Sequence, residues 1–239
     1  ISVLTTGQIA GLTSAQLAAL STAQLAAFSA AQIGALTTAA GVGLTTLDVS
    51  CLTTQQIAGL TSPQIGALTT GQLGAFSSSQ IGAVTTSAVV GLTTAEMAAL
   101  KTSQILGLTS GQIGALKTSQ IGALASAQIS ALTTQAEAGL TTADMAALTS
   151  AQISGITSVQ IAALTTPQLA ALSSAQISAI ASAAAVGLNK DQIAALKTTQ
   201  LLGLTSAQLG AWSTAQVGAL SSSQIAAITT AAEAGLNTA

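Results

Sequence analysis

Apolar residues recur every eight positions along the whole chain. From Leu4 onward the sequence divides into octads, the first three of which read LTTGQIAG, LTSAQLAA and LSTAQLAA. Twenty-nine complete octads run from residue 4 to residue 235 without an insertion or deletion. Position 1 is always apolar, position 3 is Ser or Thr in twenty-eight of thirty octads, position 5 is Gln in twenty-one of twenty-nine, and positions 7 and 8 are nearly always small. The pattern predicts a single continuous repeat array over residues 1–239, with about five units of 48 residues.

One octad fits neither a long helix nor a regular strand. Eight residues exceed two helical turns by about 80°, so the stripe at position 1 would wind around a continuous helix. In a strand, positions 1 and 6 would point to opposite faces. The pattern favours one very short helix per octad. Because one such helix buries too little to fold alone, we expect an all-α solenoid of stacked octads. A β-solenoid with two or three octads per coil is the alternative.

The start of each helix can be placed in two registers. In the first, Ser or Thr at position 3 is the N-cap, and Pro63 and Pro167 occupy the first helical position. In the second, position 2 is the N-cap, T-x-x-Q is a capping box, and the apolar residues at positions 1 and 6 form a hydrophobic staple. We favour the first register because Lys101, Lys117 and Lys197 occupy position 2.

A longer period of six octads lies over the single octad. Gln is absent from position 5 in the octads that begin at residues 36, 84, 132, 180 and 228, and each of these ends in Gly. The octads that begin at 4, 52, 100, 148 and 196 also end in Gly. We infer that six octads, one 48-residue unit, form one superhelical turn, with Gly where backbones crowd. Duplication of a 48-residue block, with no geometric meaning, is the alternative.

The charged residues follow the same period. Nine of the ten, all except Lys117, fall in three consecutive octads of each 48-residue unit. On a six-octad turn they would form a stripe down one side. The other side would then be an uncharged face of Thr, Ser and Gln.

Composition excludes most catalytic chemistry. Charged residues make up 4 %, the net charge is −2, and His, Tyr and Arg are absent. The chain therefore has no imidazole for metal binding or general-base catalysis, and no basic surface for nucleic acid. The sequence contains no run of about 18 apolar residues, so we expect no membrane-spanning helix. Glu137 and Asp144 are the only close carboxylates, and their spacing does not favour a site. We therefore expect that the protein is not an enzyme and that it has no catalytic, cofactor-binding or metal-binding residues.

A few single residues have structural interpretations. Cys51 stands where other octads have Ala or Gly and is interpreted as a small packed residue. Phe28, Phe76 and Trp212 replace Leu at position 1 and are predicted to lie in the core. The Gln series has two interpretations of equal weight. In the first, the amide of each Gln hydrogen-bonds to the corresponding Gln one coil away, as in a ladder. In the second, each Gln caps its own short helix or an adjacent one.

The two ends of the sequence suggest assembly. The chain opens with Ile1 rather than Met, so we expect a mature product or a piece of a longer chain. Joined tail to head, LNTA and ISV make an octad one residue short. Neither terminus carries the polar capping repeat of a solitary solenoid, and open ends generate filaments.

Two resemblances bear on function. Residues 60–65, LTSPQI, resemble the opening helix of TAL-effector repeats over that helix only; the base-reading loop and basic stripe are absent, so DNA binding is not implied. All 239 residues are similar to the LTxxQ-type octapeptide tandem-repeat regions of large secreted bacterial surface and adhesin-like proteins. That resemblance implies an extracellular or cell-surface structural role.

We therefore expect a structural protein: a self-assembling extracellular filament or stalk whose partner is a second copy of itself. The alternative is an adhesive module that binds a glycan, a surface or ice through the uncharged Thr/Ser/Gln face.

Overall fold

The structure is a computed structural model that describes residues 2–238, and the side chains up to residue 236. The chain forms two compact units, Ile1–Ala123 and Leu124–Ala239. The octads continue through this boundary in the sequence, and a single array over 1–239 stays a prediction. Residues 2–238 form helices and turns and contain no strand, which overturns the β-solenoid alternative.

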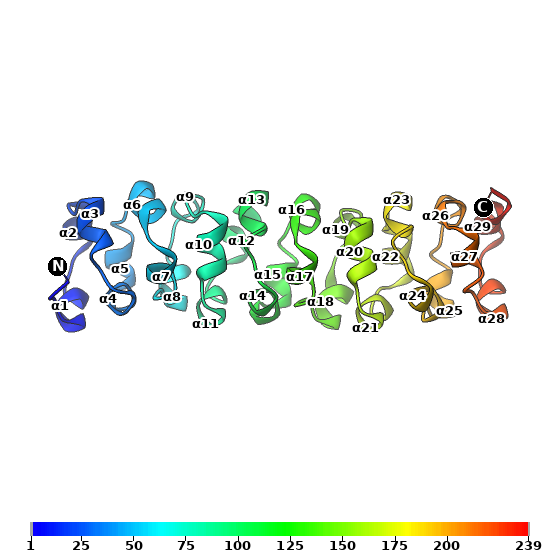
Figure 1. The fold of residues 1–239 in the computed structure, drawn as a ribbon, viewed down its shortest axis with the longest axis horizontal. Helices are drawn as coiled ribbons and strands as arrows, with labels where there is room; N and C mark the ends of the chain where they lie inside the picture. The colour runs from blue at the N-terminus through cyan, green and yellow to red at the C-terminus, as the bar shows by residue number, and fades with distance from the viewer. Residues whose placement is uncertain (1, 239) are drawn as a thin grey trace. The chain divides into compact units, whose positions relative to one another are not determined.

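Each octad of the described chain forms one short helix, as predicted (Figure 1). The first unit contains α1 (Thr6–Ala10), α2 (Ser14–Ala18), α3 (Thr22–Ala26), α4 (Ala30–Ala35), α5 (Thr38–Gly41), α6 (Thr46–Cys51), α7 (Thr54–Ile57), α8 (Ser62–Ile65), α9 (Thr70–Leu73), α10 (Ser78–Ala83), α11 (Thr86–Val89), α12 (Thr94–Ala99), α13 (Thr102–Ile105), α14 (Ser110–Ala115) and α15 (Thr118–Ile121).

The second unit has the same organisation. It contains α16 (Ser126–Ala131), α17 (Thr134–Glu137), α18 (Thr142–Ala147), α19 (Ser150–Ile153), α20 (Ser158–Ala163), α21 (Thr166–Ala170), α22 (Ser174–Ala179), α23 (Ser182–Ala185), α24 (Lys190–Ala194), α25 (Thr198–Leu201), α26 (Ser206–Ala211), α27 (Thr214–Val217), α28 (Ser222–Ile225), α29 (Thr230–Glu233) and the 3₁₀ turn η1 (Ala234–Thr238).

The N-cap of each helix lies at position 2, so the register favoured from the sequence is wrong. In α14, Thr109 Oγ1 accepts a hydrogen bond from the Gln112 backbone N–H at 3.2 Å, and Gln112 Oε1 accepts one from the Thr109 N–H at 2.8 Å. This is the capping box of the other register, and it satisfies two backbone donors that a short helix leaves open. Pro63 and Pro167 then stand at the second helical position, where no intrahelical N–H is needed.

Within each unit, three octads make one coil. Every helix packs against the helices three places before and after it in the same unit. The stacks of the first unit are α1–α4–α7–α10–α13, α2–α5–α8–α11–α14 and α3–α6–α9–α12–α15. Those of the second unit are α16–α19–α22–α25–α28, α17–α20–α23–α26–α29 and α18–α21–α24–α27. The prediction of six octads per turn is therefore wrong.

The six-octad period corresponds to two coils of three octads each. Every six-residue helix has an even number, whereas the odd-numbered helices have four or five residues. Because a coil holds an odd number of octads, even-numbered helices stack on odd-numbered ones. The pattern returns only after two coils, which together hold the six octads of the longer period. Helix length alone does not set this period, because the even-numbered helices α8 and α28 also have four residues.

Glycine at position 8 lets the backbones of neighbouring coils touch. A Cβ on Gly91 would overlap the carbonyl oxygen of Ser62, and one on Gly107 would overlap that of Ser78. The same conflict, with a Ser or Ala carbonyl of the preceding coil, exists at Gly43, Gly59, Gly155, Gly187, Gly203 and Gly235. No described residue has a positive φ, so these positions need a missing side chain rather than an unusual backbone. The prediction that they mark crowded backbones is confirmed.

Positions 1 and 6 fill the interior of each unit, and Phe28, Phe76 and Trp212 are buried there as predicted. Trp212 also donates its Nε1–H to the carbonyl of Ala185 at 3.2 Å. The interpretation of Cys51 as a small packed residue is wrong, because this residue is exposed at the end of the six-residue helix α6.

The charged residues do not form the predicted stripe. In the first unit they lie in two of the three stacks: Asp48, Glu96 and Lys117 in the stack of α3, and Lys101 in the stack of α1. In the second unit all three stacks carry charge. The stripe is wrong because it assumed twice as many octads per turn. The joining of the termini involves Ile1 and Ala239, which lie outside the described residues.

Candidate functional site

The glutamine at position 5 makes hydrogen bonds in two directions. Gln104 Oε1 accepts from the backbone N–H of Lys101 at 2.9 Å, at the start of its own helix. Its Nε2 donates to the carbonyls of Leu73 and Phe76, at 2.7 and 2.9 Å, one coil earlier. Leu73 ends α9, and its carbonyl also accepts the Phe76 backbone N–H at 3.1 Å in the turn that follows. The side chain therefore joins the start of one helix to the end of another in the preceding coil.

This contact repeats through each unit and forms what we call the glutamine layer. Each member donates Nε2 to the position 1 carbonyl of an octad in the preceding coil, and most also donate to the position 6 carbonyl just before it. In the first unit the members are Gln32, Gln56, Gln64, Gln72, Gln80, Gln104, Gln112 and Gln120. In the second they are Gln152, Gln160, Gln168, Gln176, Gln192, Gln200, Gln208, Gln216 and Gln224.

These bonds decide between the two interpretations of the Gln series. The acceptors are backbone carbonyls rather than other glutamines, so the amide ladder is wrong and the capping interpretation is confirmed. Nearly all of these glutamines are buried. The members of the glutamine layer therefore contribute little to the surface of the coils that they join.

Lysine at position 2 provides a second contact between coils. Lys101 and Lys197 are N-caps without a side-chain cap bond. Their Nζ groups donate instead to the carbonyls of Gly74 and Ala170, at 2.8 and 2.9 Å, near the ends of helices one coil earlier. This contact explains why lysine is accepted at a capping position.

Three carboxylates replace the glutamine and keep its contact with the start of the helix. Asp48, Glu96 and Asp144 each accept the N-cap backbone N–H, at 2.8, 2.6 and 2.9 Å, and each is buried. An ionised carboxylate has no proton to donate to the carbonyls of the preceding coil. These octads keep the capping box and lose the bond of the glutamine layer.

Glu137 is the most unusual titratable group in the described chain. It occupies position 6, which is apolar in most octads, and only 2 % of it is exposed. Its Oε2 has no hydrogen-bond partner among the described residues, and burial raises its pKa from 4.5 to about 7. Sequence reasoning placed Glu137 on a surface stripe and missed its burial. The signal was its place in the octad, since Glu233 is the one other charged residue at position 6.

The carboxylates do not converge on a site. Asp144 is held in the capping box of Thr141. Among residues 2–238, no group of three His, Cys, Asp or Glu side chains is placed to hold a metal ion. None of the described helices has the length and apolar character needed to cross a bilayer.

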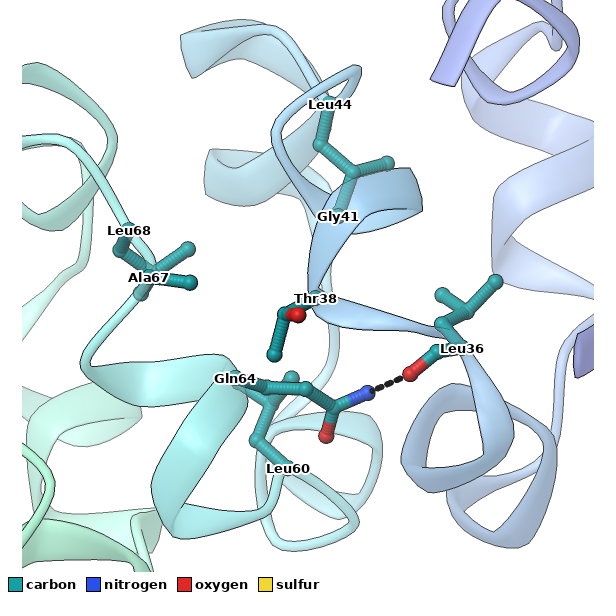
Figure 2. A pocket seen from close by; sticks show the side chains of 8 residues that line it. All are labelled: Leu36, Thr38, Gly41, Leu44, Leu60, Gln64, Ala67 and Leu68. Atoms are coloured by element: carbon teal, nitrogen blue, oxygen red, sulfur yellow. Dashed lines mark hydrogen bonds between the residues drawn. The ribbon is translucent and has the colours of Figure 1, made fainter. Parts of the chain in front are cut away.

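A small cavity lies beside an octad that lacks the large side chains usual at positions 5 and 6. At positions 5 and 6, α5 has Ala40 and Gly41. The space left is about 20 Å³, enough for roughly one water molecule. Figure 2 shows Gln64 at its edge, with its amide bonded to the carbonyl of Leu36. The cavity is too small for an organic ligand.

The glutamine layer can be tested with Gln112→Glu. Glutamate keeps the oxygen that accepts from Thr109, as Glu96 does in α12, but removes the donations to Ile81 and Val84. We expect a loss of about 2 kcal/mol in unfolding free energy at pH 7, about 1 kcal/mol for each of the two lost hydrogen bonds. Urea denaturation measures this loss of unfolding free energy. The control is Gln55→Glu, which makes the same substitution at an exposed residue.

Protonation should restore part of the lost stability of Gln112→Glu, because a neutral carboxyl has one O–H to donate. The deficit should therefore shrink as the pH falls from 7 toward about 4, and it should level off below that pH. Equal stability of Gln112→Glu and Gln55→Glu at pH 7 would contradict a stabilising role of the layer.

A match to a family model supports the repeat assignment. The family model described as the ALTTAQ repeat matches residues 1–38, 9–46, 42–78, 97–134, 105–142, 137–174 and 194–230. The search of curated proteins found no match. Among solved structures, the chain is similar to the leucine-rich repeat-containing protein LegL7 from Legionella pneumophila, with 10 % identity, a TM-score of 0.27, and coverage of 84 % of this chain and 77 % of that one. The family matches span most of the sequence and follow its octads, and the chain belongs to the ALTTAQ repeat family.

Proposed function

We propose that this chain is a structural protein, a stacked-coil element that builds an extracellular filament or stalk. The observation that carries the proposal is the glutamine layer. The glutamine at position 5, present in twenty-one of twenty-nine octads, is buried between coils in most of them, where it bonds the backbone of the preceding coil. Such a layer lets an array grow by adding coils without changing the contact. The extracellular location rests on the resemblance to repeat regions of secreted bacterial surface proteins.

The proposal is tested by the assembly state of the purified chain. Electron microscopy and sedimentation velocity over 0.1–100 µM, concentrations chosen to span roughly the micromolar range of specific association, should show elongated assemblies that lengthen with concentration. A monomer at every concentration would contradict the filament. Closed rings would contradict it as well, because a heterologous contact that closes does not propagate.

A second candidate function is binding to a regular surface such as ice or a glycan layer. One stack of the first unit carries a threonine at position 3 in every coil: Thr22, Thr46, Thr70, Thr94 and Thr118. The middle three are exposed and the outer two are half-buried. Thermal hysteresis and a glycan screen test this candidate. Activity that survives Thr70→Asp/Thr94→Asp would exclude the threonine row as the binding surface.

A further inference from the structure

A groove of about 300 Å³ lies in the first unit, where the end of α3 and the start of α4 meet the start of α7 (Figure 1). This volume is at the lower end of the range of small-molecule sites in proteins. None of the side chains that line the groove is charged. The lining residues are Ala26, Phe28, Ser29, Ala30, Thr53, Gln55 and Gln56.

The lysines of the chain show what the equivalent place in other coils accepts. Lys101 and Gly74 follow Thr53 and Ala26 by 48 residues, the length of the longer period. The Nζ group of Lys101 donates to the carbonyl of Gly74 at 2.8 Å, and Lys197 makes the corresponding bond at 2.9 Å. In these coils, the place therefore holds an alkyl chain that ends in an ammonium group.

The groove keeps the acceptor of this bond and lacks the lysine. Ala26 ends α3, and no described residue donates a hydrogen bond to its carbonyl, as is common at the last carbonyls of a helix. The shorter side chain of Thr53 bonds within its own helix instead, since its Oγ1 donates to Gln56 Oε1 at 3.3 Å. The carbonyl of Ala26 is therefore available to a donor from another molecule.

Two further residues distinguish the groove from the coils that carry lysine. Ala30 stands at position 3, which is Ser or Thr in twenty-eight of thirty octads, so the groove lacks a hydroxyl group there. Gln55 stands at position 4, where most octads have a small residue, and its side chain is exposed. An ammonium group donates three hydrogen bonds. The carbonyl of Ala26 and the amide oxygen of Gln55 can accept two of them, and water can accept the third.

We propose that this groove binds a primary ammonium group on a short alkyl chain, in the place that a lysine side chain takes in the equivalent coils. Small aliphatic amines and lysine side chains of other proteins share this chemistry. Ala30 and Phe28 would contact the alkyl chain, as apolar surface contacts the stem of a lysine. The proposal does not depend on assembly into a filament.

The test is an NMR titration of the chain with n-butylammonium, which is the side chain of lysine without its backbone. The backbone amides of Ser29 and Ala30 and the side-chain amide of Gln55 report on the groove. We expect shifts that saturate with a Kd on the order of 10 mM, as suits a few solvent-exposed contacts. The control ligand is 1-butanol, which has the same alkyl chain without the charge and should bind at least roughly tenfold more weakly.

Three variants locate the site. Thr53→Lys should abolish binding, because it supplies the ammonium group from within the chain, as Lys101 does. Thr69→Lys makes the same substitution at another exposed N-cap, outside the groove, and should bind like wild type. Gln55→Glu should bind about fivefold more tightly, because it places a carboxylate at the rim. Circular dichroism verifies that each variant is folded.

Two results would overturn the inference. If n-butylammonium and 1-butanol bind equally well, the groove does not recognise the ammonium group. If Thr53→Lys binds n-butylammonium as well as Thr69→Lys does, the amine binds elsewhere on the chain.

An acetylated and amidated tripeptide with a central lysine distinguishes the two sources of the ammonium group. Binding at least roughly tenfold tighter than that of n-butylammonium would assign the groove to a lysine of another protein. Equal or weaker binding of the tripeptide would assign the groove to a small amine.

Discussion

Alanine at Gly107 should destabilise the first unit by about 3 kcal/mol, near the upper end of the cost of overpacking a close contact. The added methyl group would occupy the volume of the Ser78 carbonyl oxygen, and the other atoms it would meet are also in Ser78. Backbone cannot rotate away as a long side chain can, so the two coils must separate. Separation would also lengthen the nearby bonds from Gln104 to the carbonyls of Leu73 and Phe76. Urea and thermal unfolding measure the loss.

The same unit offers a matched control in Gly41→Ala. A Cβ at Gly41 meets no atom within 4 Å, and the residue lies in α5 beside the small cavity. Alanine there should stabilise by about 0.5–1 kcal/mol, because glycine loses more conformational freedom on folding. The two substitutions are chemically identical and should have opposite signs. If both raise stability, coil contact is not what requires glycine at position 8.

Removal of the carboxyl group at Glu137 should stabilise the second unit in a pH-dependent way. Burial raises the pKa of this group from 4.5 to about 7, so the folded chain holds a proton that the unfolded chain releases. The native state therefore loses stability as pH rises from about 4.5 to about 7, and the loss levels off above that range. A shift of this size corresponds to about 3 kcal/mol. Below pH 4.5 both states are protonated and the group contributes no pH dependence.

Glu137→Gln should flatten that decline, so that the variant exceeds wild type in stability at about pH 8 and approaches it at about pH 4. Thermal unfolding across this range measures the difference. Glu233→Gln is the control, because Glu233 occupies the same octad position but is exposed. A parallel pH profile for wild type and Glu137→Gln would show that Glu137 is solvated or paired in solution.

The octad dictated the local structure, and its glutamine layer shows where that inference stopped. Thr or Ser at position 2 followed by Gln at position 5 is a capping box within one helical turn, so it could be read directly from the sequence. The second half of the Gln contact could not, because its acceptors lie in the preceding coil, far back along the chain. The separation in sequence between a Gln and its carbonyl acceptors depends on how many octads complete a coil.

Lys101 shows why the wrong register was attractive. Lysine has no oxygen to cap a helix, so its presence at position 2 argued against that position. The structure gives it another partner, the carbonyl of Gly74 in the preceding coil. A long-range bond had replaced a local one, and only the packed coils reveal it.

By itself, the sequence determined that the chain folds as one short helix per octad, which residues are apolar and buried, and that backbones meet at the Gly of position 8. Each of these follows from interactions within a few residues or from the size of a side chain. Only the tertiary structure decided that three octads close a coil, that the longer period spans two coils, and that the charges are spread over several stacks. The physical reason is that coil closure is fixed by contacts between residues far apart in the sequence, such as those of Gln104 with Leu73 and Phe76. The same stacking buries Glu137 in the core, against the preference of its own side chain for water.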